Sequence, residues 1–322
     1  MLRKAFPSRV RADPWKSGSS RAASAPPLDG CGHAADPTRP PTLAHHLLDD
    51  LERRRDRTLR RSPALRVSGP RRALRFLNEV GLASLYATRG LNLPCLWVAI
   101  CGRRDPRLPH NTHHDPEVGL AWELKDALPA AGKVFYAKLI RGKPTFVAWD
   151  LFPAAYRLFG PEQDYLSAYR AGLLSPTAKA ILDALDRKRP QETFELKLAT
   201  NLARPSQRRV FDTAIAELQQ RLYISMREVR YDPFTYVWDL VAARFPERVK
   251  EAGRWQAAGA ATRLTRRYLQ AVVYATPNDV AAVVGGKARA EAAVTALHRE
   301  GAVDAGGRID GLPGTWIVNR SL

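Results

Sequence analysis

One pattern, three helices followed by a two-stranded hairpin, occurs three times between residue 70 and the end of the chain. The second copy is the clearest, because apolar residues recur there at helical spacing and then alternate at strand spacing. Its helices are predicted at Thr177–Arg187, at Thr193–Thr200, and from Ser206 as N-cap to Leu222. Its strands are predicted at Tyr223–Val229 and Thr235–Leu240.

The other two copies follow the same order with different turns. In the first copy the predicted elements are helices at Pro70–Val80, Pro94–Ile100 and Glu117–Leu128 and strands at Val134–Ile140 and Thr145–Leu151. In the third they are helices at Leu264–Tyr274, Pro277–Val284 and Lys287–Glu300 and strands at Ala302–Ala305 and Thr315–Val318. Thr276 is the expected N-cap of the helix that begins at Pro277.

Three helices and a hairpin are the elements of a winged helix-turn-helix. The sequence therefore predicts an α+β chain of three tandem winged helices at residues 63–160, 161–250 and 251–322. Residues 1–62 are interpreted as a disordered basic leader with a short helix near 43–61. Three interpretations of this helix stay open: a solvated helical lead-in or a mis-called start, a basic arm that follows phosphates, and a mitochondrial presequence.

The charge of the chain favours a polyanionic partner. Its 322 residues include 51 Lys and Arg against 32 Asp and Glu, a formal net charge of +19, with the excess concentrated before residue 160. We expect double-stranded DNA as partner, no small-molecule cofactor, and a cytoplasmic, nucleoid-associated protein. No apolar run approaches the roughly 18 residues of a spanning helix, and no secretory signal is present. Three cysteines are too few for a disulfide framework or a four-thiolate zinc site.

In a winged helix the third helix enters the major groove, and the hairpin reaches flanking phosphates or the minor groove. Arg and Gln are also the side chains that bind guanine and adenine edges bidentately. The candidate DNA contacts are Gln207, Arg208 and Arg209, Lys287 and Arg289, and the hairpin residues Arg141, Lys143 and Arg308. Glu217 and Glu291 interrupt the two helical faces, so a solvated helix face is the alternative interpretation.

The chain resembles the AlkZ/YcaQ-type winged-helix DNA glycosylases, bacterial proteins of three tandem winged helices that excise alkylated or crosslinked bases. The similar segments are Arg72–Leu82 with Leu96 and Trp97, Ala216–Leu222 with Val237–Leu240 and Arg244–Pro246, and Ala275–Val280 with Ala296–Gly301. The resemblance spans roughly residues 63–318. It implies DNA binding and, for an active member, hydrolysis of an N-glycosidic bond.

The sequence departs from this family at the catalytic motif. The family carries Gln-x-Asp or Gln-x-Gln where this chain has Ser84 and Tyr86, and Glu79 is the nearest carboxylate. The family also continues into a C-terminal β-rich domain, whereas this sequence ends at Leu322. Cleavage of a glycosidic bond passes through an oxocarbenium-like state that needs a stabilising, water-orienting group. With Glu79, Ser84 and Tyr86 as the candidate catalytic residues, we expect weak or absent excision.

One His- and Asp-rich segment, His110–Asp115, has ligand types that suit a metal ion. Pro109 and Pro116 bracket it, so we interpret it as a polar loop in which Asp115 caps the next helix, and we expect no metal. A metal-binding or active-site loop and a DNA-contacting loop are the alternatives. For the whole chain, the alternatives to a glycosylase-like DNA binder are a non-enzymatic winged-helix transcription regulator and a protein-interaction scaffold.

Overall fold

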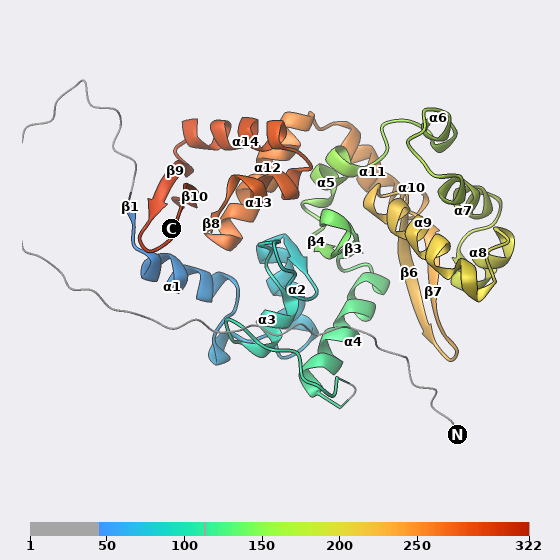
Figure 1. Ribbon diagram of the computed structural model, residues 1–322, viewed down its shortest axis with the longest axis horizontal. Helices are drawn as coiled ribbons and strands as arrows, with labels where there is room; N and C mark the ends of the chain where they lie inside the picture. The colour runs from blue at the N-terminus through green and yellow to red at the C-terminus, as the bar shows by residue number, and fades with distance from the viewer. Residues whose placement is uncertain (1–44, 113, 322) are drawn as a thin grey trace, which may run out of the picture. The chain divides into compact units, whose positions relative to one another are not determined.

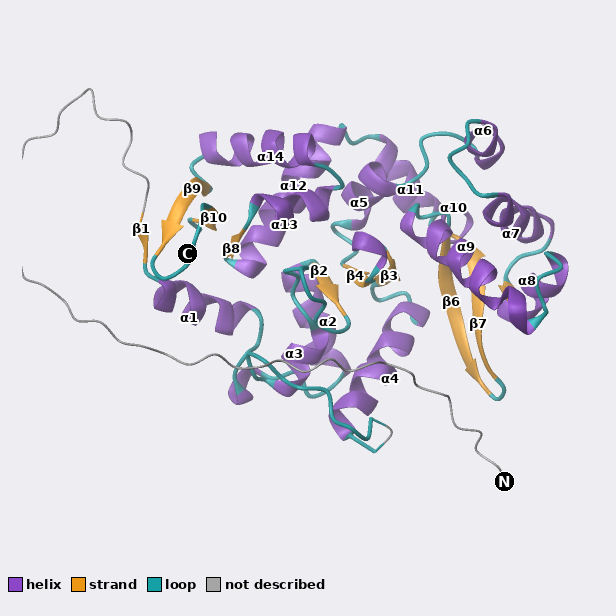
Figure 2. Ribbon diagram, viewed as in Figure 1, coloured by secondary structure: helices purple, strands orange, loops and turns teal. Residues whose placement is uncertain are grey.

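The computed structural model describes residues 45–112 and 114–321, all of which belong to one compact unit that spans residues 43–322. This unit mixes helices with three small sheets (Figures 1 and 2). The same order of elements, helix, strand, helix, helix and hairpin, occurs three times in it. We call each occurrence a module: module 1 spans residues 70–147, module 2 residues 176–240 and module 3 residues 257–319.

The modules contain most of the helices and strands. Module 1 consists of α2 (Pro70–Val80), β2 (Leu82–Ser84), α3 (Leu96–Cys101), α4 (Pro116–Ala130), β3 (Phe135–Lys138) and β4 (Pro144–Val147). Module 2 consists of α7 (Pro176–Arg187), β5 (Gln191–Glu192), α8 (Thr193–Ala199), α9 (Arg208–Gln220), β6 (Ile224–Tyr231) and β7 (Phe234–Leu240). Module 3 consists of α12 (Ala257–Val272), β8 (Tyr274–Ala275), α13 (Pro277–Val284), α14 (Lys287–Arg299), β9 (Val303–Ile309) and β10 (Trp316–Asn319).

The remaining elements precede or connect the modules. They are β1 (His45–His46), α1 (Leu48–Thr58), α5 (Phe152–Phe159), α6 (Tyr165–Arg170), α10 (Val241–Arg244), α11 (Pro246–Gly253) and the 3-10 turns η1 (Pro63–Leu65), η2 (Ile140–Gly142) and η3 (Pro205–Gln207). The hairpin patterns did not predict the short strands β5 and β8. Each of them pairs with the last strand of its own module and completes a three-stranded arrangement.

The three sheets share one connectivity. The strand orders are β2-β4-β3, β5-β7-β6 and β8-β10-β9, so in each the strand that follows the first helix lies beside the last strand of the hairpin. All of these pairs are antiparallel, and β1 adds a parallel strand to the outer edge of β9.

Local signals place most helix ends as predicted. Side-chain oxygens of Asp115, Ser175 and Thr276 accept hydrogen bonds from backbone N–H groups at the starts of α4, α7 and α13. Ser206 is a correction: it lies within the 3-10 turn η3, and Gln207 occupies the N-cap position of α9. The predicted strand at Thr145–Leu151 was also too long, because β4 ends at Val147 and the chain then turns into α5.

Helix α12 holds the centre of the largest core. Its buried residues include Leu264, Tyr268 and Leu269, and it packs against α1, α2, α5, α13 and α14. The prediction began this helix too late, at Leu264, and ended it in what is β8. Gly81 shows how tight the packing is: its φ is +76°, and a Cβ there would lie 2.4 Å from Leu151 Cδ1.

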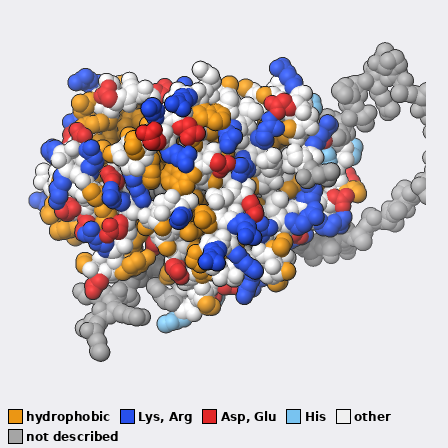
Figure 3. Space-filling view, turned by 180° about the vertical axis from the view of Figure 1, so that it is seen from behind, with side chains coloured by type: hydrophobic (Ala, Val, Ile, Leu, Met, Phe, Trp, Pro, Cys, Tyr) orange, Lys and Arg blue, Asp and Glu red, His pale blue; other side chains and the backbone are white. Residues whose placement is uncertain are grey.

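The segment before module 1 is part of the fold. The short helix predicted near 43–61 is present as α1, whereas the assignment of the described residues 45–62 to a disordered leader is corrected. Leu51 and Arg55 of α1 are buried, and the Arg55 guanidinium lies 4.5 Å from the centre of the Tyr274 ring. Arg55 and Arg61 both form ion pairs with Glu52 at 3.1 Å. Several arginines of the predicted phosphate-following arm therefore form internal contacts. Figure 3 shows Lys and Arg side chains spread over the visible face and interspersed with Asp and Glu. The predicted leader from residue 1 to 44 lies outside the described residues.

Replacing Leu51 should reveal the contribution of α1 to stability. Leu51→Ala removes a side chain that is 3% exposed, and we expect a loss of about 2–5 kcal/mol, a fall in Tm of roughly 5 °C or more. Leu47→Ala is the matched control, because Leu47 adjoins the same helix but is 62% exposed. Thermal unfolding followed by circular dichroism measures both. Equal Tm values for the two variants would contradict the packing role of α1.

Candidate nucleic-acid interface

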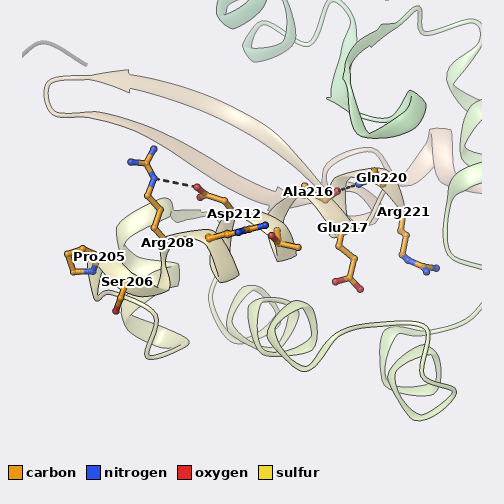
Figure 4. Close-up of a pocket in the computed structure, with 10 residues that line it drawn as sticks. Pro205, Ser206, Arg208, Asp212, Ala216, Glu217, Gln220 and Arg221 are labelled. Carbon is orange, nitrogen blue, oxygen red and sulfur yellow. Dashed lines mark hydrogen bonds and ion pairs between the residues drawn. The ribbon is translucent and has the colours of Figure 1, made fainter. Parts of the chain in front are cut away.

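The third helix of module 2, α9, is amphipathic and leaves one long polar face in solvent. Its buried stripe contains Phe211, Ala214 and Leu218, which pack into the module 2 core. A shallow groove of about 740 Å³ lies along the opposite face (Figure 4). It is lined by Pro205, Ser206, Arg208, Arg209, Asp212, Thr213, Ala216, Glu217, Gln220 and Arg221.

Two of the three arginines in this groove are unpaired. Arg208 Nε lies 3.4 Å from Asp212 Oδ2, one helical turn away, and both side chains are more than half exposed. Arg209 and Arg221 form no ion pair with an acidic side chain of the described chain. Exposed guanidinium groups of this kind are available to phosphate oxygens and base edges. The sequence analysis did not name Arg221, although its predicted helix ran to Leu222; in the structure Arg221 directly follows the last residue of α9.

The carboxylate of Glu217 is hydrogen-bonded to the start of the neighbouring helix α7. It accepts hydrogen bonds from the Ser175 backbone N–H at 2.9 Å and from Ser175 Oγ at 2.6 Å. Ser175 is the N-cap of α7, so the negative charge of Glu217 lies near the positive end of that helix. The sequence identified Glu217 as an interruption of a basic face. Its contacts show that it joins α9 to α7 instead.

Module 1 supports the other end of α9. The Lys138 backbone N–H of β3 donates to Gln219 Oε1 at 3.1 Å, and Gln219 is buried. The hairpin tip of module 1 also lies near α9: a Cβ atom added to Gly142 would lie 3.2 Å from Gln220 Nε2. Arg141 at this tip donates to the Gly90 carbonyl at 2.6 Å, while Lys143 stays exposed. The open part of α9 is therefore its N-terminal half.

The third helix of module 1, α4, is covered by the hairpin of module 2. Tyr231 Oη donates to Asp126 Oδ2 at 3.0 Å, and Lys125 Nζ donates to Tyr236 Oη at 3.2 Å. Lys125 also pairs with the buried Asp126. The Arg244 guanidinium donates to the Pro129 carbonyl near the end of α4 at 3.0 Å. These contacts attach the C-terminal half of α4 to module 2, whereas Gly119, Trp122 and Glu123 nearer its start are exposed.

The candidates in module 3 are spread over separate places. Lys287 lines a hollow of about 410 Å³ together with Glu291, whose charge opposes it. Arg289 donates to the Leu158 carbonyl of α5 at 3.4 Å. Arg308 lies in β9 and lines a different hollow of about 380 Å³ beside Asp310. These three cations do not form one basic surface as α9 does.

The catalytic candidates do not converge. Glu79 is 48% exposed and pairs with Arg60, whereas Ser84 is 3% exposed within β2. Ser84 Oγ donates to the Pro94 carbonyl at 3.3 Å, and its backbone N–H donates to the same carbonyl at 2.8 Å. No hydrogen bond joins Glu79 to Ser84 in the part of the chain that the structure describes. Ser84 therefore has no open space in which to hold a nucleophilic water.

Tyr86 is likewise used in packing. Its ring centre lies 5.9 Å from that of Trp97, and burial raises the pKa of its hydroxyl to about 12. A phenol with this pKa is neutral at pH 7 and brings no negative charge to the position where the glycosylases have a carboxylate or amide. Cys95, which pairs with Ser84 in an isolated bridge, is 5% exposed, and burial raises the pKa of its thiol.

The His110–Asp115 segment contributes a helix cap. Asp115 Oδ1 accepts from the Val118 backbone N–H at 2.9 Å, as the sequence predicted. His113 lies outside the described residues. Among the residues that are described, no group of three or more His, Cys, Asp or Glu side chains could hold a metal ion. None of the described helices has the length and apolar composition needed to cross a lipid bilayer.

Comparison with known proteins identifies the family. The model of the family described as "AlkZ related" matches residues 67–285, about two thirds of the chain. The chain belongs to the AlkZ-related family. This match spans modules 1 and 2, the connecting helices, and α12 and α13. The expected resemblance to AlkZ-type proteins is thereby confirmed.

A solved structure is also similar, at low sequence identity. The DNA glycosylase AlkZ of Streptomyces sahachiroi aligns with 14% identity and a TM-score of 0.49, covering 83% of this chain and 69% of that one. No curated protein matches the chain significantly.

The two described cysteines should be poor nucleophiles in the folded protein. Burial and the neighbouring Glu117 carboxylate raise the pKa of Cys101 to about 12, so at pH 8 only about one thiol in ten thousand is ionised. We expect Cys95 and Cys101 to resist iodoacetamide at pH 8 in a Cys31→Ser background and to react on unfolding. Mass spectrometry of labelled peptides measures both rates. Equal rates in folded and unfolded protein would contradict these environments.

Proposed function

We propose that this chain is a duplex-DNA-binding protein of the DNA-repair type, with modules 1, 2 and 3 acting as three winged helices. The observation that carries the proposal is the exposed face of α9, with Arg208 and Arg209 at its N-terminal end and Arg221 just after its last residue. The AlkZ-related family membership and the net charge of +19 support DNA as the polyanion. Nucleoid DNA is the proposed location.

Module 2 is the proposed reading module. In a winged helix the N-terminal residues of the third helix contact base edges, and Gln207, Arg208 and Arg209 occupy that end of α9. Arg side chains there can bind guanine bidentately, while Arg221 at the opposite end can contact a phosphate. Because the C-terminal half of α4 is attached to the module 2 hairpin and β3 contacts Gln219, module 1 is proposed to hold α9 in place.

Base excision through the positions used by the glycosylases is not part of this proposal. The transition state needs a charge-stabilising group and an oriented water at one place. Ser84 is buried and hydrogen-bonded, Tyr86 is neutral, and Glu79 pairs with Arg60 at the surface. We propose that the chain binds DNA without excision chemistry at these residues.

The α9 proposal predicts a specific loss of affinity. Arg208→Ala with Arg209→Ala should weaken binding to a 20-base-pair duplex by on the order of tenfold at 0.1 M salt. The slope of log affinity against log salt should become shallower by about 2 if both arginines contact phosphates, and by less if one contacts a base. Fluorescence anisotropy between 50 and 200 mM salt measures both quantities.

A charge-matched control separates this surface from net charge. Arg248→Ala with Lys250→Ala removes the same charge from α11, where Arg248 pairs with Glu251 at 3.3 Å. We expect near wild-type affinity for this control. Equal losses in both double variants would show that only net charge matters. Binding by the wild-type chain that does not change with salt would refute phosphate recognition.

Excision should be absent. A duplex that contains N7-methylguanine, incubated with the wild-type chain and then cleaved at abasic sites, should give no more product than spontaneous depurination. Glu79→Gln and Ser84→Ala should give the same background, with an active alkylpurine glycosylase as positive control. Excision above background that Glu79→Gln lowers tenfold or more would show that Glu79 acts in catalysis and would overturn this part of the proposal.

A further inference from the structure

A second set of arginines lies on α2, away from α9. Arg71, Arg72 and Arg75 are exposed, while Ala73, Phe76, Leu77 and Val80 on the opposite face are buried. At 100° per residue the three arginines fall within one third of the helix circumference. Arg71 and Arg75 are separated by one turn, about 6 Å along the axis. Arg66, just before the helix, is also exposed.

These four arginines differ from their neighbours in having no acidic partner. Nearby, Arg60 pairs with Glu79, Arg103 with Glu117 and Arg104 with Asp56. No carboxylate of the described chain forms an ion pair with the arginines at positions 66, 71, 72 and 75. Arg72 Nη1 donates to the Arg66 carbonyl at 3.3 Å, which places these two residues side by side.

The position of these arginines is electrostatically unfavourable in the protein without a bound anion. Arg71 and Arg72 lie in the first turn of α2, where the partial positive charge of the helix disfavours cations. That turn has no acidic residue, and its N-cap, Gly69, has no side chain to accept a hydrogen bond. A bound anion would offset this repulsion. α9 also begins with two arginines and no acidic residue in its first turn.

We propose that Arg66, Arg71, Arg72 and Arg75 form a second phosphate-binding surface for duplex DNA, separate from α9. The proposal rests on the proposed function, because DNA binding through α9 supplies the polyanion. In Figure 1 α2 and α9 lie apart, and α2 belongs to module 1 whereas α9 belongs to module 2. This α2 surface contacts the phosphates of the DNA backbone and does not read the base sequence.

The test compares three double variants of the full chain that each remove two positive charges. They are Arg71→Ala with Arg75→Ala, Arg208→Ala with Arg209→Ala, and the α11 control Arg248→Ala with Lys250→Ala. Anisotropy on a 40-base-pair duplex gives the affinity and the salt slope. We expect the α2 variant to bind on the order of tenfold more weakly at 0.1 M salt, for any duplex sequence. Its slope of log affinity against log salt should be shallower by about 2.

The outcomes distinguish the two proposals. If the α9 variant weakens binding and the α2 variant equals the control, the α2 surface is refuted and the proposed function stands. If all three bind like wild type, both the α9 and the α2 surface are refuted; the proposed function itself fails if the wild-type chain shows no salt-dependent binding to the duplex. A larger loss for single-stranded RNA of equal length than for duplex DNA would also overturn the α2 assignment.

Folding is checked in the same series. Removing cations from the first turn should leave Tm unchanged or slightly higher. If Tm falls, Arg71→Lys with Arg75→Lys decides the matter, because lysine keeps the phosphate-binding charge. Retained affinity in the lysine variant supports the surface, and an equal loss refutes it.

Discussion

The burial of α12 is the constraint on which the arrangement of the modules depends. This helix belongs to module 3 but packs against α1, α2 and α5 as well as its own α13 and α14. Two hydrogen bonds add directional contacts between α12 and other segments of the chain. Tyr268 Oη donates to the Asn92 carbonyl at 2.6 Å, and Thr58 Oγ1 of α1 donates to the Ala271 carbonyl at 2.7 Å. Because α12 shares its core with module 1 and the connecting helices, these parts form one body that can support α9.

The third helix of each module (α4, α9 and α14) has the same place in the order of elements but different surroundings. α4 is covered by the β6–β7 hairpin through Asp126 and Lys125, and α14 carries Glu291 beside Lys287. α9 leaves its N-terminal half in solvent, since its supports from Lys138 and Ser175 act on later positions. A helix-and-hairpin pattern therefore predicts where a reading helix would lie, and long-range contacts decide whether it is free to read DNA.

Signals local in sequence predicted much of the fold. Apolar spacing and a C-terminal glycine placed α2 from Pro70 to Val80, and the cap Thr276 placed α13. Short strands such as β5 were missed because two residues carry no period, and their pairing partner lies more than forty residues away. The site was harder to predict, since the contacts of Glu217 and Arg141 with residues distant in sequence have no local signal.

Ser84, which the resemblance in sequence places at the catalytic motif of the glycosylases, is buried in the packing of module 1. β2 pairs with β4, Ser84 opposite Thr145, and its other side meets Pro94 and Cys95. The serine satisfies its hydroxyl there with one carbonyl, that of Pro94. The adjoining Tyr86 packs on Trp97 where the glycosylases have a polar group. Both side chains therefore pack within module 1, whereas the exposed arginines lie on the outer faces of helices such as α2 and α9.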